Sequence, residues 1–228
     1  MSQTSTAADW AVQGTTLFLG ALDDLRDADL DGATTLPGWT RRHLVAHVAA
    51  NAEAIGRLVS WARSGQETPM YASSEQRAAD IAAGARRSPE ELRGWAHRSA
   101  DALAAAFAAL PPSCWEAEVV TAQGRRVPAT ELPWMRAREV AVHTVDLRTG
   151  VVFADLPAGF CRALVEDVVE HRSRVGDGPA PNVAGDGTTW RVRGVGEPTS
   201  VTLPIAELAA WLTGRLIRAD LPELSPWL

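Results

Sequence analysis

The sequence lacks several features that mark simple classes of protein. Its 228 residues include no lysine, so all 22 basic residues are arginines, against 28 acidic residues and a net charge of −6. The arginines occur in short runs, such as Arg41-Arg42 and Arg125-Arg126, and form no concentrated basic patch of the kind that a nucleic acid requires. We therefore expect no nucleic-acid partner.

Cysteines and long apolar runs are also scarce. Cys114 and Cys161 lie far apart in the chain and form no CxxC pair, which is typical of a reducing compartment. No stretch approaches the roughly 18 apolar residues of a membrane span, and the N-terminal residues lack the pattern of a signal peptide. These absences predict a soluble cytoplasmic protein with no membrane contact. The sequence leaves the oligomeric state open and is compatible with a monomer.

Hydrophobic periodicity predicts four helices in the first 150 residues, and capping signals mark two of their starts. Thr40 is a candidate N-cap of the second helix, and Ser88-Pro89-Glu90-Glu91 is typical of a helix start with a capping box. The expected helices cover residues 8–28, 41–64, 89–110 and 134–149. Together they predict a four-helix bundle over residues 1–150.

Two segments of this region depart from the helical period. Residues 66–87 contain Pro69 and a polar run, so we expect a long loop with one helical turn, of the kind that often covers a site. Residues 117–128 alternate in polarity around Gln123-Gly124 and predict a short hairpin.

The pattern changes after residue 150. A helical stretch around Leu164 is followed by a passage rich in glycine, proline and aspartate, from Gly176 to Gly187. Candidate strands at 189–193 and 200–203 and a helix at about 205–217 then predict a small α+β domain over residues 151–228. The expected fold class is therefore mainly α, a four-helix bundle followed by a small α+β C-terminal domain.

Histidines and a glutamate lie four residues apart on two of the predicted helices. His43 and His47 share one face of the second helix, and Glu139 and His143 share one face of the fourth. In a bundle, such side chains on facing helices can converge and bind a divalent ion, and three ligands leave zinc an open position. The spacing does not choose between His43 and His47.

The apolar neighbours of these histidines favour a metal site. Burying two imidazoles and a carboxylate among valines and leucines is costly unless the groups are paired or bound to a cation. A buried His–Glu pair without metal is the alternative. Asp146, which follows His143 by three residues, either accepts a hydrogen bond from that imidazole or is a solvated residue at the helix end.

At these residues the sequence resembles the mycothiol-dependent maleylpyruvate isomerases, members of the DinB-like metal-binding superfamily of four-helix bundles. The likeness extends over most of the first 150 residues and more weakly beyond them. Its matching segments are GWTRRHLVAHVAANA (38–52), GQETPMY (65–71), VVTAQGRRVPA (119–129), WMRAREVAVHTVDL (134–147), WLTGR (211–215) and the C-terminal PWL (226–228).

The resemblance also implies site residues. In that family a histidine of the second helix and the Glu and His of the ExxxH motif bind zinc, which maps the ligands to His47, Glu139 and His143. The smaller C-terminal domain of the family supplies an active-site arginine, which maps to Arg215, with Arg218 as the nearby alternative. The resemblance identifies no residues that contact mycothiol.

The activity that the resemblance implies is the mycothiol-dependent isomerisation of maleylpyruvate to fumarylpyruvate, a step of gentisate-type aromatic degradation. A cis double bond becomes trans only if it is temporarily single, and a thiolate achieves this by adding to the alkene and leaving again. Neither cysteine has a neighbouring base in the sequence, so we expect the thiolate to come from mycothiol bound at zinc. Arg215 would pair with a carboxylate of the dicarboxylate substrate.

Two other functions remain open. A mycothiol S-transferase on the same fold would leave the thiol on its product, whereas an isomerase releases it. A non-catalytic, zinc-stabilised binding module would have a closed metal site with four ligands. The GQETPMY and TAQGR segments favour the isomerase.

Overall fold

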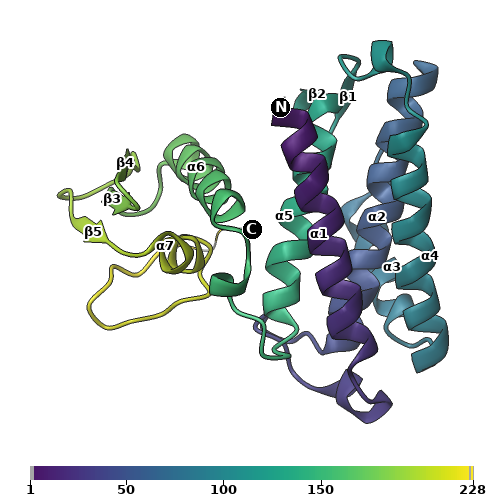
Figure 1. The fold of residues 1–228 in the computed structure, drawn as a ribbon, viewed down its shortest axis with the longest axis horizontal. Helices are drawn as coiled ribbons and strands as arrows, with labels where there is room; N and C mark the ends of the chain where they lie inside the picture. Colours follow the sequence, from purple (N-terminus) through teal and green to yellow (C-terminus); the bar gives the residue numbers. More distant parts are fainter. Residues whose placement is uncertain (1–2, 226, 228) are drawn as a thin grey trace. The chain divides into compact units, whose positions relative to one another are not determined.

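The computed structural model of the protein describes residues 3–225 and 227, in two compact units, Met1–Gly150 and Val151–Leu228 (Figure 1). The first unit is mainly helical and the second combines helices with a small sheet, so the predicted mainly α fold class is confirmed. Two residues of the C-terminal PWL segment, Pro226 and Leu228, lie outside the described residues. None of the described helices is long and apolar enough to cross a membrane.

Four long helices form the bundle of the first unit. Helix α1 packs along α5 and helix α2 along α4, and α2 also contacts α5 (Figure 1). Their bounds are Gln3–Asp23 for α1, Arg41–Ser64 for α2, Pro89–Ala108 for α4 and Leu132–Asp146 for α5. The first helix starts earlier than the predicted 8–28, and it also ends earlier, because Asp27–Asp31 forms a separate 3-10 helix, η1.

The ends of α2 and the start of α4 follow their capping signals. Ser88 accepts a hydrogen bond from the backbone N–H of Glu91, whose carboxylate accepts one from the N–H of Ser88. Gly65 ends α2 in the left-handed region, at φ 73°, with its N–H bonded to the carbonyl of Trp61. Helix α2 begins at Arg41, directly after Thr40, and α4 begins at Pro89, directly after Ser88, so both helices begin where the capping residues predict.

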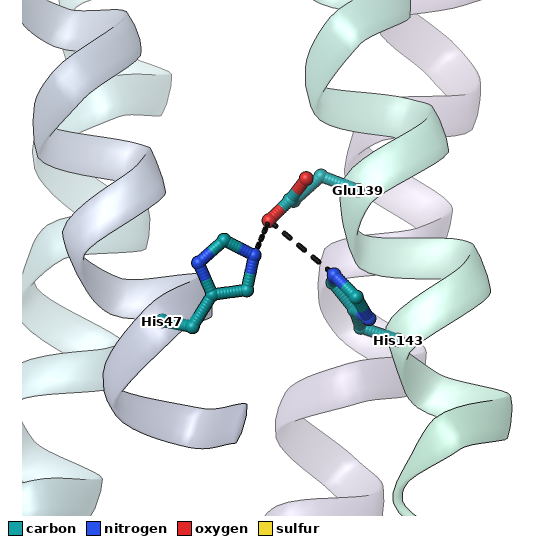
Figure 2. Close-up of side chains that lie close together, drawn as sticks. All are labelled: His47, Glu139 and His143. Carbon is teal, nitrogen blue, oxygen red and sulfur yellow. Dashed lines mark ion pairs between the residues drawn. The ribbon is translucent and has the colours of Figure 1, made fainter. Parts of the chain in front are cut away.

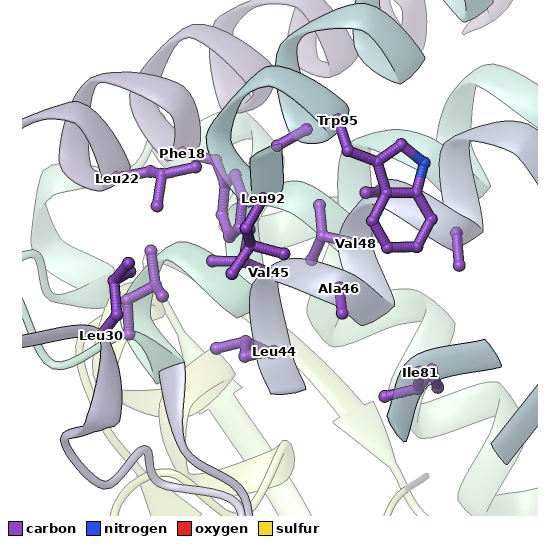
Figure 3. Close-up of a cluster of buried hydrophobic side chains, with 14 of the residues drawn as sticks. Phe18, Leu22, Leu30, Leu44, Val45, Ala46, Val48, Ile81, Leu92 and Trp95 are labelled. Carbon is purple, nitrogen blue, oxygen red and sulfur yellow. The ribbon is translucent and has the colours of Figure 1, made fainter. Parts of the chain in front are cut away.

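The core of the bundle joins α1, α2 and α4 around one cluster of buried apolar side chains (Figure 3). Phe18 and Leu22 of α1 are almost fully buried, as are Leu44 of α2 and Leu92 of α4. Close packing of this kind holds α2 in a fixed rotation. The labelled members of the cluster are Phe18, Leu22, Leu30, Leu44, Val45, Ala46, Val48, Ile81, Leu92 and Trp95.

The 66–87 segment contains an eleven-residue helix, α3, at Ser74–Gly84, so the expectation of a loop with one helical turn was wrong. Ser73 caps its start by accepting from the N–H of Gln76, and Ile81 is buried in the bundle core. A Cβ at Gly84 would lie 2.5 Å from Cζ3 of Trp95. Tertiary packing against α2 and α4 therefore stabilises this polar helix.

The predicted hairpin is confirmed. Strand β1, Glu118–Val120, pairs antiparallel with β2, Arg126–Pro128, and the opposed residues Val119 and Val127 are both buried. Short 3-10 helices complete the connections of the chain; they are η2 at Pro112–Cys114, η3 at Ala129–Glu131 and η4 at Phe153–Asp155.

The second unit has two helices and a three-stranded sheet in the order β4-β3-β5. The central strand pairs antiparallel with β4 and parallel with β5. Its elements are α6 at Ala158–Val175, β3 at Asn182–Gly185, β4 at Thr188–Arg191, β5 at Ser200–Thr202 and α7 at Ile205–Leu212. Strand β3 lies in the passage for which no element was predicted, and α7 ends five residues before the predicted end.

Candidate metal centre

Three side chains converge between α2 and α5. His47 extends from α2 toward Glu139 and His143, which lie one turn apart on α5 (Figure 2). One ligand atom from each residue lies within 4.8 Å of the others. The Oε1 atom of Glu139 is 2.6 Å from Nε2 of His47 and 3.6 Å from Nε2 of His143. The structure thus brings together the three residues that were predicted as metal ligands.

The other histidine of α2 takes part in the helix cap. The Nδ1 atom of His43 lies 2.9 Å from Oγ1 of Thr40 and accepts the backbone N–H of Thr40 at 3.4 Å. His43 is the N3 residue of α2, one turn before His47. His43 therefore caps the helix, and His47 is the histidine of this HxxxH pair that joins Glu139 and His143.

Glu139 presents a buried oxygen to the two imidazoles. Its Oε1 lies 2.6 Å from Nε2 of His47 and 3.6 Å from Nε2 of His143, and no other group among the described residues bonds to it. Burial disfavours the charge of this carboxylate, but the nearby His47, His143 and Arg136 outweigh that effect and lower its pKa below the usual value. Glu139 is therefore an ionised acceptor with a free coordination position.

Arg136 supplies a buried positive charge next to this group. It is 3% exposed and donates from Nη1 to the carbonyl of Val48 and to Oδ1 of Asn51. Burial lowers its pKa to about 10, so it remains charged at neutral pH. It thereby stabilises the Glu139 carboxylate without being a metal ligand itself.

The protonation state of His47 also suits a metal. Burial lowers its pKa below the ordinary histidine value, against the opposing attraction of Glu139. A neutral imidazole has a lone pair for coordination. Two imidazole nitrogens and one carboxylate oxygen form a donor set that suits zinc and leaves a fourth position open. In residues 3–225 and 227 no fourth protein ligand joins the group, as a closed structural site would require.

Asp146 holds the second ligand imidazole. Its Oδ2 lies 2.8 Å from Nδ1 of His143, and its side chain is fully buried. The hydroxyl of Thr35 donates to the other carboxylate oxygen, and the backbone N–H of Thr35 donates to the carbonyl of Asp146. Asp146 is thus an acceptor that directs Nε2 of His143 toward Glu139, and it is not a solvated residue.

Other groups surround His47. Trp39 meets its ring edge-on at 5.4 Å between centroids, and Nη2 of Arg77 lies 3.3 Å from its Nδ1. The guanidinium of Arg77 also lies over the ring of Tyr71, at 5.6 Å from its centroid. Burial, followed by the charge of Glu139, raises the pKa of Tyr71, which keeps its hydroxyl protonated. Sequence analysis did not predict these three residues. Trp39 and Tyr71 lie within segments that match the family, which could have pointed to them, whereas Arg77 lies in no matching segment.

Arg215 belongs to the second unit, in the WLTGR turn. The N–H of Gly214 bonds to the carbonyl of Trp211 and that of Arg215 to the carbonyl of Ala210, which is the Schellman pattern at the end of α7. Gly214 provides the left-handed residue, at φ 79°. The guanidinium is half-buried, donates to the carbonyl of Thr213 and lies 5.9 Å from the ring centroid of Trp227.

Arg218 has a different environment from that of Arg215. It is exposed and forms ion pairs with Asp220 at 2.6 Å and with Glu207 at 3.1 Å. Its charge is therefore already matched by two carboxylates of its own unit.

Neither cysteine lies in the metal-ligand group. Cys161 is buried, donates from Sγ to the carbonyl of Phe153, and has its pKa raised to about 11 by burial. Cys114 is partly exposed in η2. A thiolate that reacts at this centre would therefore come from outside the chain.

Comparisons with known proteins agree with this geometry. A family model described as the mycothiol maleylpyruvate isomerase N-terminal domain matches residues 11–148, which include all three predicted ligands. A comparison with curated proteins found no match.

Two solved structures are similar to the chain along nearly its whole length. A crystal structure of the mycothiol-dependent maleylpyruvate isomerase is 33% identical, with a TM-score of 0.92 over 99% of this chain and 98% of that chain. A crystal structure of a histidine-to-alanine mutant of the mycothiol-dependent maleylpyruvate isomerase has the same identity and coverage, with a TM-score of 0.93. The chain belongs to the mycothiol-dependent maleylpyruvate isomerase family.

Proposed function

We propose that this protein catalyses the mycothiol-dependent conversion of maleylpyruvate to fumarylpyruvate, with zinc held by His47, Glu139 and His143. The observation that carries the proposal is the convergence of these three ligand atoms within 4.8 Å, in a chain that is 33% identical over 99% of its length to a mycothiol-dependent maleylpyruvate isomerase. The unpaired cysteines Cys114 and Cys161 are compatible with the reducing cytoplasm in which a thiol cofactor stays reduced.

The chain's own residues prepare the centre for a thiol. Glu139 supplies a negatively charged oxygen, and His47 and His143 supply imidazole nitrogens as the other two ligands. Asp146 orients His143, and the edge of Trp39 limits the movement of His47. Zinc bound there would supply an open coordination position at which the thiol of mycothiol loses its proton.

The substrate needs a cation as well as a nucleophile, because it has two carboxylates. We assign one of them to Arg215, whose guanidinium can form two parallel hydrogen bonds with a carboxylate. Its anchoring in the Schellman turn and against Trp227 restricts the side chain before binding. Arg218 is the alternative, and its guanidinium forms ion pairs with Asp220 and Glu207.

The central experiment is a spectrophotometric maleylpyruvate assay on zinc-loaded protein, with and without mycothiol. We expect turnover only with mycothiol and release of fumarylpyruvate that carries no thiol. A product that retains the thiol would instead establish an S-transferase, and zinc binding without turnover would indicate a binding module.

The metal ligands are tested by replacing each of His47, Glu139 and His143 with Ala. Removing one of three ligands should abolish both stoichiometric zinc and turnover, because two ligands do not retain the ion. Zinc is measured by mass spectrometry of the purified protein. His97→Gln is the matched control, since His97 is a partly exposed histidine that pairs with Asp23. A variant that lacks zinc but keeps full mycothiol-dependent turnover would contradict the assignment.

Arg215→Ala should keep the zinc and the fold while kcat/KM falls. The loss corresponds to about 2 to 5 kcal/mol of transition-state stabilisation, the range for truncating a buried, hydrogen-bonded charge pair. Arg218→Ala removes the same charge three residues away and should have little effect. The reverse order of effects would transfer the role to Arg218.

A further inference from the structure

The two histidines of the metal centre differ at their second ring nitrogen. Nδ1 of His143 lies 2.8 Å from Asp146, a hydrogen-bond acceptor, as is usual for a metal-binding histidine. Nδ1 of His47 lies 3.3 Å from Nη2 of Arg77, a group that can only donate. One ligand is therefore supported by an anion, while the other faces a cation.

This contact with Arg77 is compatible with only one tautomer of His47. To accept from Arg77, Nδ1 must be unprotonated, which places the ring proton on Nε2, next to Glu139. When Nε2 donates its lone pair to a metal, the neutral ring carries its proton on Nδ1 instead. Two donors then face each other, so His47 no longer holds the Arg77 guanidinium.

Arg77 has no anionic partner of its own. No carboxylate forms an ion pair with it in the described part of the chain, and its other close neighbour is the ring of Tyr71. The side chain is half-buried. A guanidinium without a carboxylate, released beside a metal centre, is suited to bind an anionic ligand in two parallel hydrogen bonds.

The segment that carries Arg77 is anchored in the bundle. Arg57 of α2 donates from Nε and Nη2 to the carbonyl of Met70, at 2.9 and 2.7 Å, just before Tyr71. Helix α3 is capped by Ser73 and buries Ile81 in the core. Arg77 is therefore placed next to His47 by elements that do not depend on a ligand.

We infer that Arg77 binds a carboxylate of the substrate beside the metal centre and thereby determines specificity for an anionic alkene. This inference rests on the proposed function and extends it, because it names a residue of the bundle itself that would bind a carboxylate of the substrate. The predicted role is in binding, so Arg77 should affect the substrate and leave the metal and mycothiol unchanged.

The test compares Arg77→Gln and Arg77→Lys with the wild type and with Arg86→Gln, which removes an exposed charge just after α3. Zinc content and thermal unfolding establish that each variant is folded and loaded. Calorimetry then measures the affinity of the zinc-loaded protein for maleate, a cis dicarboxylate, and kinetics give separate KM values for maleylpyruvate and mycothiol.

For Arg77→Gln we expect maleate affinity to fall and the KM for maleylpyruvate to rise about 10- to 100-fold, as for the loss of hydrogen bonds to a charged group. Arg77→Lys, which keeps the charge but not the planar fork, should lie between this variant and the wild type. Arg86→Gln should match the wild type. Zinc content and the KM for mycothiol should not change.

The outcomes separate the two proposals. An inactive wild type would refute the proposed function, and the maleate affinities would still decide whether Arg77 binds a carboxylate. An active wild type with unchanged maleate affinity in Arg77→Gln would overturn the inference. A rise in the KM for mycothiol alone would also overturn it, because Arg77 would then act on the thiol.

Discussion

The bundle and the C-terminal unit each contain a buried arginine, and the two charges have different partners. Arg136 is 3% exposed in α5, and its charge acts on Glu139 of the candidate metal centre. Arg172 is 7% exposed in α6 and donates to the carbonyls of Leu212 and Ser225, at 2.8 and 3.0 Å. Both arginines donate to main-chain carbonyls of their own unit, but only Arg136 also stabilises the charge of a predicted metal ligand.

This difference indicates that the stability of the fold and metal binding are linked in the bundle and not in the C-terminal unit. In the bundle, the cost of burying Arg136 is offset in part by a carboxylate that also belongs to the metal-ligand group, so a change in either alters both properties. In the C-terminal unit, Arg172 donates to the main-chain carbonyls of Leu212 and Ser225 and to the hydroxyl of Ser225. We therefore expect the two arginines to have separable effects when they are replaced.

The largest effect is expected for Arg136→Met. Removing this cation leaves the Glu139 carboxylate with less compensation and the buried Val48 carbonyl and Asn51 Oδ1 without their donor, which should destabilise the metal-free protein by about 3 to 5 kcal/mol. Zinc neutralises the same carboxylate, so the loss should be smaller in the zinc-loaded protein. Urea unfolding with and without zinc measures both values. Equal losses in the two states would show that Arg136 acts on the fold alone.

The pH dependence of the same variant gives a second check. Because the folded pKa of Glu139 is lowered, its charge contributes stability above the ordinary carboxyl range, and this is lost as pH falls through the folded pKa. Without Arg136 the folded pKa rises, so the loss should be smaller and should be complete at a higher pH. Arg63→Met, at an exposed position of α2, should leave the profile unchanged.

A smaller and more local effect is expected for Arg172→Met. The carbonyls of Leu212 and Ser225 would lose a charged donor, at a cost of about 1.5 to 3 kcal/mol. Hydrogen exchange should report faster opening of α6 and α7, with unchanged protection in the bundle and unchanged zinc content. Equal loss of protection in the bundle would contradict the separation of the two arginines.

The parts of the fold that follow local rules were predictable from the sequence. Thr40 and Ser88 mark the starts of helices through bonds to residues three positions away, so the starts of α2 and α4 could be derived. Strand β3 could not, because it is stabilised by pairing with β4 and β5 on both sides. Helix α3 was missed for a similar reason, since Ile81 and the close contact at Gly84 involve other helices.

The same division applies to the metal centre. The i, i+4 spacing of Glu139 and His143 predicted that they share a face, whereas the choice of His47 over His43 required a family resemblance. The capping role of His43 provides the structural reason for that choice. Thr35 and Arg77 were not predicted, because their contacts join residues 111 and 30 positions apart and correspond to no short motif.

The smallest effects are expected where a hydrogen bond only orients a ligand, as at Asp146 and Thr35. Asp146→Asn keeps the shape but removes the charge behind His143, so zinc affinity should fall about 10- to 100-fold with little change in stability. Thr35→Val removes one neutral donor to Asp146 and should cost about fivefold, the equivalent of one ordinary hydrogen bond. Competition with a chelator measures both affinities. If Asp146→Asn bound zinc as tightly as the wild type, the charge of Asp146 would not contribute to zinc binding. Asp146 would then serve to attach Thr35 to α5.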